Sequence, residues 1–133
     1  MLPQRLLLVF GLLLGSACSA ADEQPPPRTV QSESGALEAE LVPHTAVTRG
    51  SNQLSLWVRD ASSGTNIGDL ELAMVPFMPA MGHGSGVEPS VKPLGNGEYV
   101  FSGVVLNMAG RWQLRTTVSG PRSDYVAFDV DVP

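Results

Sequence analysis

Apolar and polar side chains alternate along most of the chain from residue 35 to residue 133. The alternation is clearest in six runs, at residues 37–41, 54–58, 70–74, 99–106, 112–118 and 126–132. A period of two residues is typical of β-strands that bury one face, and no segment has the 3.6-residue period of an amphipathic helix. The pattern therefore predicts an all-β domain.

Turn-forming residues separate these runs. Glycine accompanied by alanine, serine, asparagine or proline occurs at residues 49–52, 60–68, 95–97, 109–110 and 119–121. Such clusters mark turns between strands. Six or seven short strands spaced in this way in one small domain are typical of immunoglobulin-like folds. We therefore predict an immunoglobulin-like two-sheet β-sandwich of about seven short strands, occupying residues 35–133.

Residues 1–18 have the order of a secretory signal peptide. Arg5 precedes an apolar run at residues 6–14, and the small residues 15–17 lead to Cys18, the only cysteine. The run is too short for a transmembrane helix. The cysteine directly after small residues resembles the lipobox of bacterial lipoproteins, which implies that Cys18 is lipidated; an ordinary signal peptide with an incidental cysteine is the alternative. By the same resemblance, Ser19 favours the outer membrane, so we expect an exported, periplasm-facing, membrane-anchored lipoprotein.

The segment that follows, residues 19–34, contains three consecutive prolines together with several serines and acidic residues. It has almost no large apolar side chains and cannot bury a core, so we predict a disordered, solvated tether. The chain has a formal net charge of −5, and loss of Arg5 with the signal peptide makes it one unit more negative. An acidic protein repels polyanions, so we expect no nucleic-acid partner and attachment to the membrane through the lipid only.

Residues 75–89 interrupt the alternation. This segment contains three prolines and three glycines, which we expect to prevent regular strand pairing. It also carries Phe77, Met78 and Met81, apolar side chains that an ordinary solvated loop would not expose. Loops held by a rigid scaffold often carry function, so this segment is the candidate functional region.

Methionine is concentrated around this segment, because all four methionines other than the initiator lie between residues 74 and 108. Met78, Met81 and His83 form the sequence Met-x-x-Met-x-His. Thioether and imidazole donors suit Cu(I) better than Zn(II), Mg(II) or Ca(II). Glycines on both sides of His83 would allow the backbone to bring two sulfurs and a nitrogen together. The spacing is therefore compatible with a Cu(I) site.

Packing offers a second interpretation, because methionine is also a flexible core filler. Met74 has the parity of the apolar residues in its run, so we expect it in the core. The parity of Met108 allows either a core position or a ligand. Met78 and Met81 could close the open end of the sandwich. Spacing alone leaves both interpretations open.

Three ordered motifs resemble the YtkA-like domain family, which is related to FixH proteins. They are Met-x-x-Met-x-His at residues 78–83, Gly-x-Tyr at 97–99 and Met-x-Gly-x-Trp at 108–112. The resemblance extends over residues 35–133 and implies an immunoglobulin-like sandwich. It also implies copper handling, since members occur beside copper-efflux adaptors and respiratory-oxidase assembly factors. Carried over by position, Met78, Met81 and His83 are the implied loop ligands for Cu(I), and Met108 is the candidate fourth.

Other chemistries fit the sequence less well. A blue-copper electron carrier needs a cysteine thiolate with two histidines, but the only cysteine is Cys18 in the signal region. A Gly-x-Ser-x-Gly nucleophile elbow at Ser85 fails because position 87 is valine. The second histidine, His44, follows a proline near a strand end and is expected to be exposed. We therefore expect no enzymatic activity.

Two functional hypotheses follow. The first is an exported lipoprotein domain that binds Cu(I) through a Met/His loop, for periplasmic copper handling or delivery to a cuproprotein or copper-transport partner. The second is an immunoglobulin-like interaction module of the cell envelope that binds no metal. Convergence of the sulfurs of Met78 and Met81 with a ring nitrogen of His83 would favour the first. Both methionines in the core, with His83 facing solvent, would contradict it.

Overall fold

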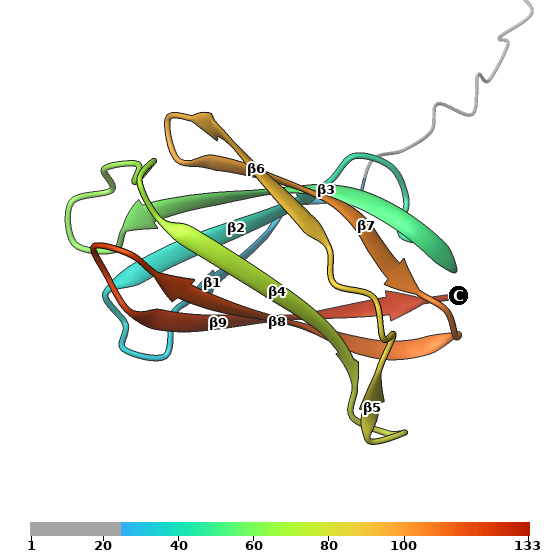
Figure 1. Cartoon of the computed structure of the whole chain (residues 1–133). Helices are drawn as coiled ribbons and strands as arrows, with labels where there is room; N and C mark the ends of the chain where they lie inside the picture. Colours follow the sequence, from blue (N-terminus) through green and yellow to red (C-terminus); the bar gives the residue numbers. More distant parts are fainter. Residues whose placement is uncertain (1–24) are drawn as a thin grey trace, which may run out of the picture.

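The computed structural model describes residues 25–133, which form two antiparallel β-sheets packed face to face (Figure 1). The predicted signal peptide, the lipidation site Cys18 and residues 19–24 lie outside the described residues, and what was expected of them stays a prediction. Within the described range, no helix is long and apolar enough to cross a membrane.

Nine strands make up the two sheets of residues 25–133. The first sheet has the order β1 (Arg28–Gln31), β2 (Leu37–Pro43), β3 (Gly50–Asp60), β7 (Glu98–Leu106), β6 (Ser90–Gly95). The second has the order β5 (His83–Gly84), β4 (Glu71–Met78), β8 (Gly110–Ser119), β9 (Asp124–Val132). Apart from β1 and β5, the seven strands follow the A-B-E-D and C-F-G order of an immunoglobulin constant domain. The predicted sandwich is confirmed, with two additional strands.

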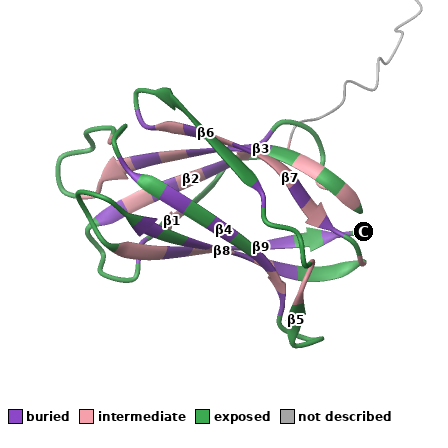
Figure 2. Ribbon diagram, in the orientation of Figure 1, coloured by how far each residue is buried: buried purple, intermediate pink, exposed green. Residues whose placement is uncertain are grey.

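The core lies between the sheets and is filled by the inward-facing residues of the alternating runs (Figure 2). In β2, for example, every second side chain is buried, which is the pattern expected of a strand with one solvated face. Leucine and valine supply most of the core, and its largest fully buried side chains are Trp112, Tyr99, Phe101 and Phe128. Met74 is fully buried, as predicted.

The domain begins earlier than predicted, because strand β1 lies within the segment expected to be a disordered tether. It pairs antiparallel with β2, starting with Arg28 opposite Leu41. Only one of its residues, Val30, is even half-buried, so an edge strand of this kind leaves no alternating signal in the sequence. The tether prediction is therefore wrong for residues 28–31, where hydrogen bonding to a neighbouring strand, and not burial, orders the chain.

The prolines of residues 75–89 do not prevent strand pairing. Strand β4 continues through Pro76, which lies opposite Leu114 of β8, and ends at Met78. Proline has no backbone N–H, so it is tolerated in a strand where that position faces the sheet edge and not the neighbouring strand. The expectation of irregular structure is therefore wrong for residues 75–78 and for β5, which resumes the pairing.

Candidate metal-binding hairpin

Strands β4 and β5 form a tight hairpin at one end of the sandwich (Figure 1). Met78 lies opposite His83 in this pairing. Backbone N–H groups of Met81 and Gly82 close the turn by donating to the carbonyl of Met78, at 3.1 and 3.0 Å. Directly opposed residues of antiparallel strands present their side chains on the same face of the sheet. Met78 and His83 therefore share one face, with Met81 in the turn between them.

Met78 belongs to the core as well as to the hairpin. Its side chain is only 5% exposed. Its terminal carbon Cε lies 2.6 Å from the position that a Cβ on Gly110 would occupy. Gly110 also has a φ of +127°, a conformation that side chains rarely adopt. Glycine at position 110 therefore provides both this backbone conformation and the room for the end of Met78.

Met81 and His83 lie at the surface. The Met81 side chain is 52% exposed, and His83 is also exposed. The Nδ1 atom of His83 is 3.0 Å from the carbonyl oxygen of Gly84. A carbonyl only accepts hydrogen bonds, so Nδ1 is the donor, and in the neutral ring this leaves the lone pair on Nε2. In this tautomer an imidazole can bind a metal through Nε2.

Met108 lies in the turn between β7 and β8 and is half-buried against the core. The indole N–H of Trp112 donates to the carbonyl oxygen of Met108 at 3.0 Å, which fixes the turn. Gly110, which contacts the end of Met78, belongs to the same short segment. The motif Met-x-Gly-x-Trp thus has a structural explanation: it joins the β7–β8 turn to the hairpin and places Met108 at the same end of the sandwich.

The structure therefore brings the four candidate ligands to one end of the fold but buries them to different extents. Met78 faces the core, Met108 is half-buried, and Met81 and His83 are exposed. This arrangement meets neither of the two outcomes set out for the loop, since one methionine is in the core and the other is not. Residues 25–133 contain no group of three or more His, Cys, Asp or Glu that could hold a metal ion. A metal bound at this hairpin would depend on thioether donors and one imidazole.

The Gly-x-Tyr motif also serves the fold. The buried hydroxyl of Tyr99 donates to the carbonyl of Ile67 at 2.8 Å and accepts the N–H of Leu70 at 3.0 Å. Burial raises the pKa of Tyr99, which keeps the hydroxyl a donor. The motif thus anchors the connection from β3 to β4. Of the three motifs, only the first contains exposed side chains, Met81 and His83, that the packing of the sandwich does not explain.

The second histidine belongs to a separate cluster on the first sheet. His44, exposed as predicted, has its Nε2 2.8 Å from the hydroxyl of Ser55, which in turn donates to Oε1 of Glu98 at 3.0 Å. The alternation predicted that Ser55 lies on the polar face of its strand. In the structure Ser55 is buried beside His44 and Glu98, and no pattern in the sequence indicated these contacts. His44 is not part of the hairpin.

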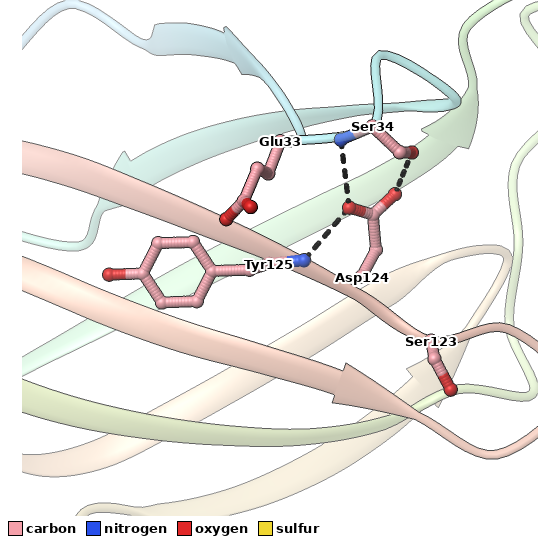
Figure 3. Close-up of a pocket in the computed structure, with 5 residues that line it drawn as sticks. All are labelled: Glu33, Ser34, Ser123, Asp124 and Tyr125. Carbon is pink, nitrogen blue, oxygen red and sulfur yellow. Dashed lines mark hydrogen bonds between the residues drawn. The ribbon is translucent and has the colours of Figure 1, made fainter.

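A cavity of about 340 Å³ lies between the β1–β2 turn and the β8–β9 turn (Figure 3). The carboxylate of Asp124 accepts hydrogen bonds from the hydroxyl of Ser34 at 2.5 Å, the N–H of Ser34 at 3.2 Å and the N–H of Tyr125 at 2.9 Å. Burial acts to raise the pKa of Asp124, but these hydrogen bonds outweigh it and lower the pKa. These hydrogen bonds join the two turns and engage both carboxylate oxygens of Asp124 with donors of the protein itself. We therefore do not treat this cavity as a candidate ligand site.

Comparison with known proteins gives one family. A family model described as YtkA-like matches residues 31–117, a range that includes all three sequence motifs and all four candidate ligands. No curated protein and no solved structure matches the chain.

Proposed function

Because the chain belongs to the YtkA-like family, we propose that its β-sandwich binds Cu(I) at the β4–β5 hairpin and exchanges this ion with a protein partner in the periplasm. The ion is cargo, and the domain catalyses no reaction. Met81 and His83 are the exposed donors, and Met78 and Met108 complete the set. The chain is exported and held at the membrane by a lipid on Cys18.

The observation that supports this proposal is the pairing of the hairpin. Met78 lies opposite His83, and the turn between them holds Met81, so three donors come from one short, hydrogen-bonded segment. Two thioethers and an imidazole are soft and borderline ligands, a set that favours Cu(I) over hard cations. A hairpin whose backbone is already ordered loses less conformational entropy on binding than a mobile loop would.

Burial divides the donors by role. Met81 and His83 reach solvent, so the ligands of a partner protein can approach them and take over the ion by ligand exchange. Hydrogen bonding of Nδ1 to the carbonyl of Gly84 directs Nε2 to that task. Met78 and Met108 stay with the sandwich, where their thioethers are shielded from water and from competing hard ligands.

A competitive Cu(I) titration of the full chain against a chromogenic chelator, under reducing conditions, tests the proposal. The test variant is Met81→Leu/His83→Ala, in which both substituted side chains are exposed and the fold should persist. Met74→Leu is the matched control, because Met74 lies on the same strand as Met78 but is fully buried. His44→Ala controls for loss of a histidine elsewhere.

We expect the wild-type chain and both controls to take one equivalent of Cu(I) from the chelator, and the test variant to take none. Circular dichroism of the test variant should show an unchanged β-sheet spectrum. If the wild-type chain does not compete for Cu(I), or if the folded test variant competes as well as the wild type, the proposal is wrong.

A further inference from the structure

The methionines of residues 25–133 differ widely in their access to solvent. Met74 is 0% exposed and Met78 is 5% exposed, and both belong to the hydrophobic core. Met108 is half-buried and packs against that core. Met81, in the turn between β4 and β5, is 52% exposed. Of these four thioethers, the one at position 81 is therefore by far the most accessible to a reagent in solution.

The surroundings of Met81 leave it open. Residues 79–83 are all exposed, and Figure 2 shows the tip of the β4–β5 hairpin as exposed surface. Gly82, the next residue, has nothing within 4 Å of the position that a Cβ would occupy, so no other described segment packs against the turn there. A reagent as small as hydrogen peroxide can therefore approach the Met81 side chain from solvent.

Peroxides oxidise methionine by transfer of one oxygen atom. The sulfur lone pair attacks one peroxide oxygen and the O–O bond breaks. The attacked oxygen becomes the sulfoxide oxygen, and its proton leaves with the other oxygen as water. Sulfur loses two electrons and the peroxide gains them. Methionine sulfoxide reductases reverse the reaction, so the step can serve as a switch.

Oxidation at position 81 is compatible with the fold. Backbone N–H groups of Met81 and Gly82 hold the turn by donating to the carbonyls of Met78 and Pro79, and the Met81 side chain takes no part in these bonds. A sulfoxide at this position stays in water, which hydrates its new oxygen. At Met74 the same oxygen would enter the core and need a donor there, which destabilises the native state. Burial thus restricts tolerated oxidation to the hairpin.

The oxidised side chain is a poorer ligand for Cu(I). A thioether is a soft donor, whereas a sulfoxide is polar and presents a hard oxygen, which Cu(I) disfavours. Met81 and His83 are the exposed donors of the proposed site, so oxidation removes one of the two donors that a partner protein can reach. This consequence rests on the proposed function, whereas the selective oxidation of Met81 does not.

We propose that Met81 is an oxidative modification site, and that its reversible conversion to the sulfoxide by peroxide switches off Cu(I) binding at the β4–β5 hairpin while the sandwich stays folded. Burial protects Met74 and Met78 from the same reaction, and partial burial slows it at Met108. The hairpin then responds to oxidants as well as to copper.

The first test maps the oxidation of the metal-free full chain by hydrogen peroxide, using mass spectrometry of its peptides. The exposures of 52% and 5% predict that Met81 is oxidised about tenfold faster than Met78, and Met108 should be intermediate. In urea, where burial is lost, the four methionines should react at similar rates. Circular dichroism should be unchanged when Met81 alone is oxidised. Oxidation of Met78 or Met108 as fast as Met81, or unfolding of the chain oxidised at Met81 alone, would overturn the proposal.

The second test is the competitive Cu(I) titration of the chain oxidised at Met81, after removal of peroxide. Loss of a residue that only supports a metal ligand typically weakens binding about 10–100-fold, so loss of a ligand should weaken it by at least about tenfold. Treatment with methionine sulfoxide reductases should restore the binding of the unoxidised chain. Met81→Leu is the matched control, because the same dose of peroxide should leave its Cu(I) binding unchanged.

The outcomes separate this proposal from the proposed function. Equal Cu(I) binding by the oxidised and unoxidised chains would overturn the switch and leave the proposed function standing. Failure of the unoxidised chain to bind Cu(I) would overturn both, and the peptide map would still show whether Met81 is the reactive site. A loss of binding that the reductases do not reverse, or an equal loss in Met81→Leu, would place the damage elsewhere and overturn the switch.

Discussion

Replacement of Gly97 by alanine tests how strongly close backbone packing constrains the turn before β7. Gly97 has a φ of +81°, and a Cβ there would lie 2.7 Å from the carbonyl oxygen of Val58 and 3.1 Å from the N atom of Ile67. Gly95, in the same turn, has a φ of +91° but nothing within 4 Å of its Cβ position. Gly95→Ala therefore introduces the same kind of backbone strain without the crowding, and it is the matched control.

The two substitutions should differ by the cost of the close contact. An alanine at positive φ costs about 1–2 kcal/mol at either position. At position 97 the added methyl group would also lie 2.9 Å from Cβ of Asn66, and its backbone neighbours are held in place. Val58 N–H donates to the carbonyl of Gly97, and the carbonyl of Val58 accepts the N–H of Ile67, both at 2.9 Å. Overpacking against such atoms costs roughly 1–3 kcal/mol more. We therefore expect Gly97→Ala to lower the free energy of unfolding by about 2–5 kcal/mol, against about 1–2 kcal/mol for Gly95→Ala.

Urea unfolding followed by tryptophan fluorescence would measure both variants against the wild type. In thermal unfolding the additional cost corresponds to a Tm for Gly97→Ala that is about 4–20 °C below that of Gly95→Ala. Equal losses of stability in the two variants would refute the reasoning, because the backbone around Val58 would then relax to admit the methyl group at no cost.

Two further predictions concern polar groups. Tyr99→Phe removes the acceptor for the buried N–H of Leu70 at 3.0 Å, and should lower the free energy of unfolding by about 1–3 kcal/mol in urea titrations. Hydrogen bonds from Ser62 and then from Arg122 hold the pKa of Asp60 well below its usual range, so its contribution to stability is present at neutral pH and is lost as the pH falls below about 4. Asp60→Asn should therefore be less stable than the wild type at pH 7, and thermal melts recorded at decreasing pH should show the difference shrinking; a constant difference would contradict this assignment.

The fold was largely predictable because most strands have one buried and one solvated face. The alternation along β2, β8 and β9 follows directly from their position between core and solvent. Strand β6 could not be found in this way, because all six of its residues are exposed and no period of burial marks it. The short edge strand β1 was missed for the same reason, since hydrogen bonds to β2 hold it in place.

The sequence alone identifies the candidate ligands of the proposed site, but it does not predict how they are arranged. Met78 follows Met74 by four residues, so it faces inward if the strand continues. The proline between them, however, suggested that the strand ends before Met78. The opposed pairing of Met78 and His83 depends on the length of the turn, which is closed by hydrogen bonds to the carbonyls of Met78 and Pro79. The contact of Met78 with Gly110 joins segments far apart in sequence, and no local pattern encodes it.

The early start of β1 has a consequence for where Cu(I) would be transferred to a partner protein. Nine residues, 19–27, separate Cys18 from Arg28, and a fully extended chain of that length spans roughly 30 Å. Arg28 lies opposite Leu41, so β1 begins at the end of the sandwich where β2 ends. At the same end β3 begins opposite Leu106, the last residue of β7, and the turn with Met108 follows. The chain therefore enters β1 at the end of the sandwich that holds Met108. If Cys18 is lipidated as proposed, a link of this length would keep the end of the sandwich that carries the thioethers within about 30 Å of the membrane surface. A partner protein anchored in the same bilayer could then reach the thioethers while both proteins stay attached to the membrane.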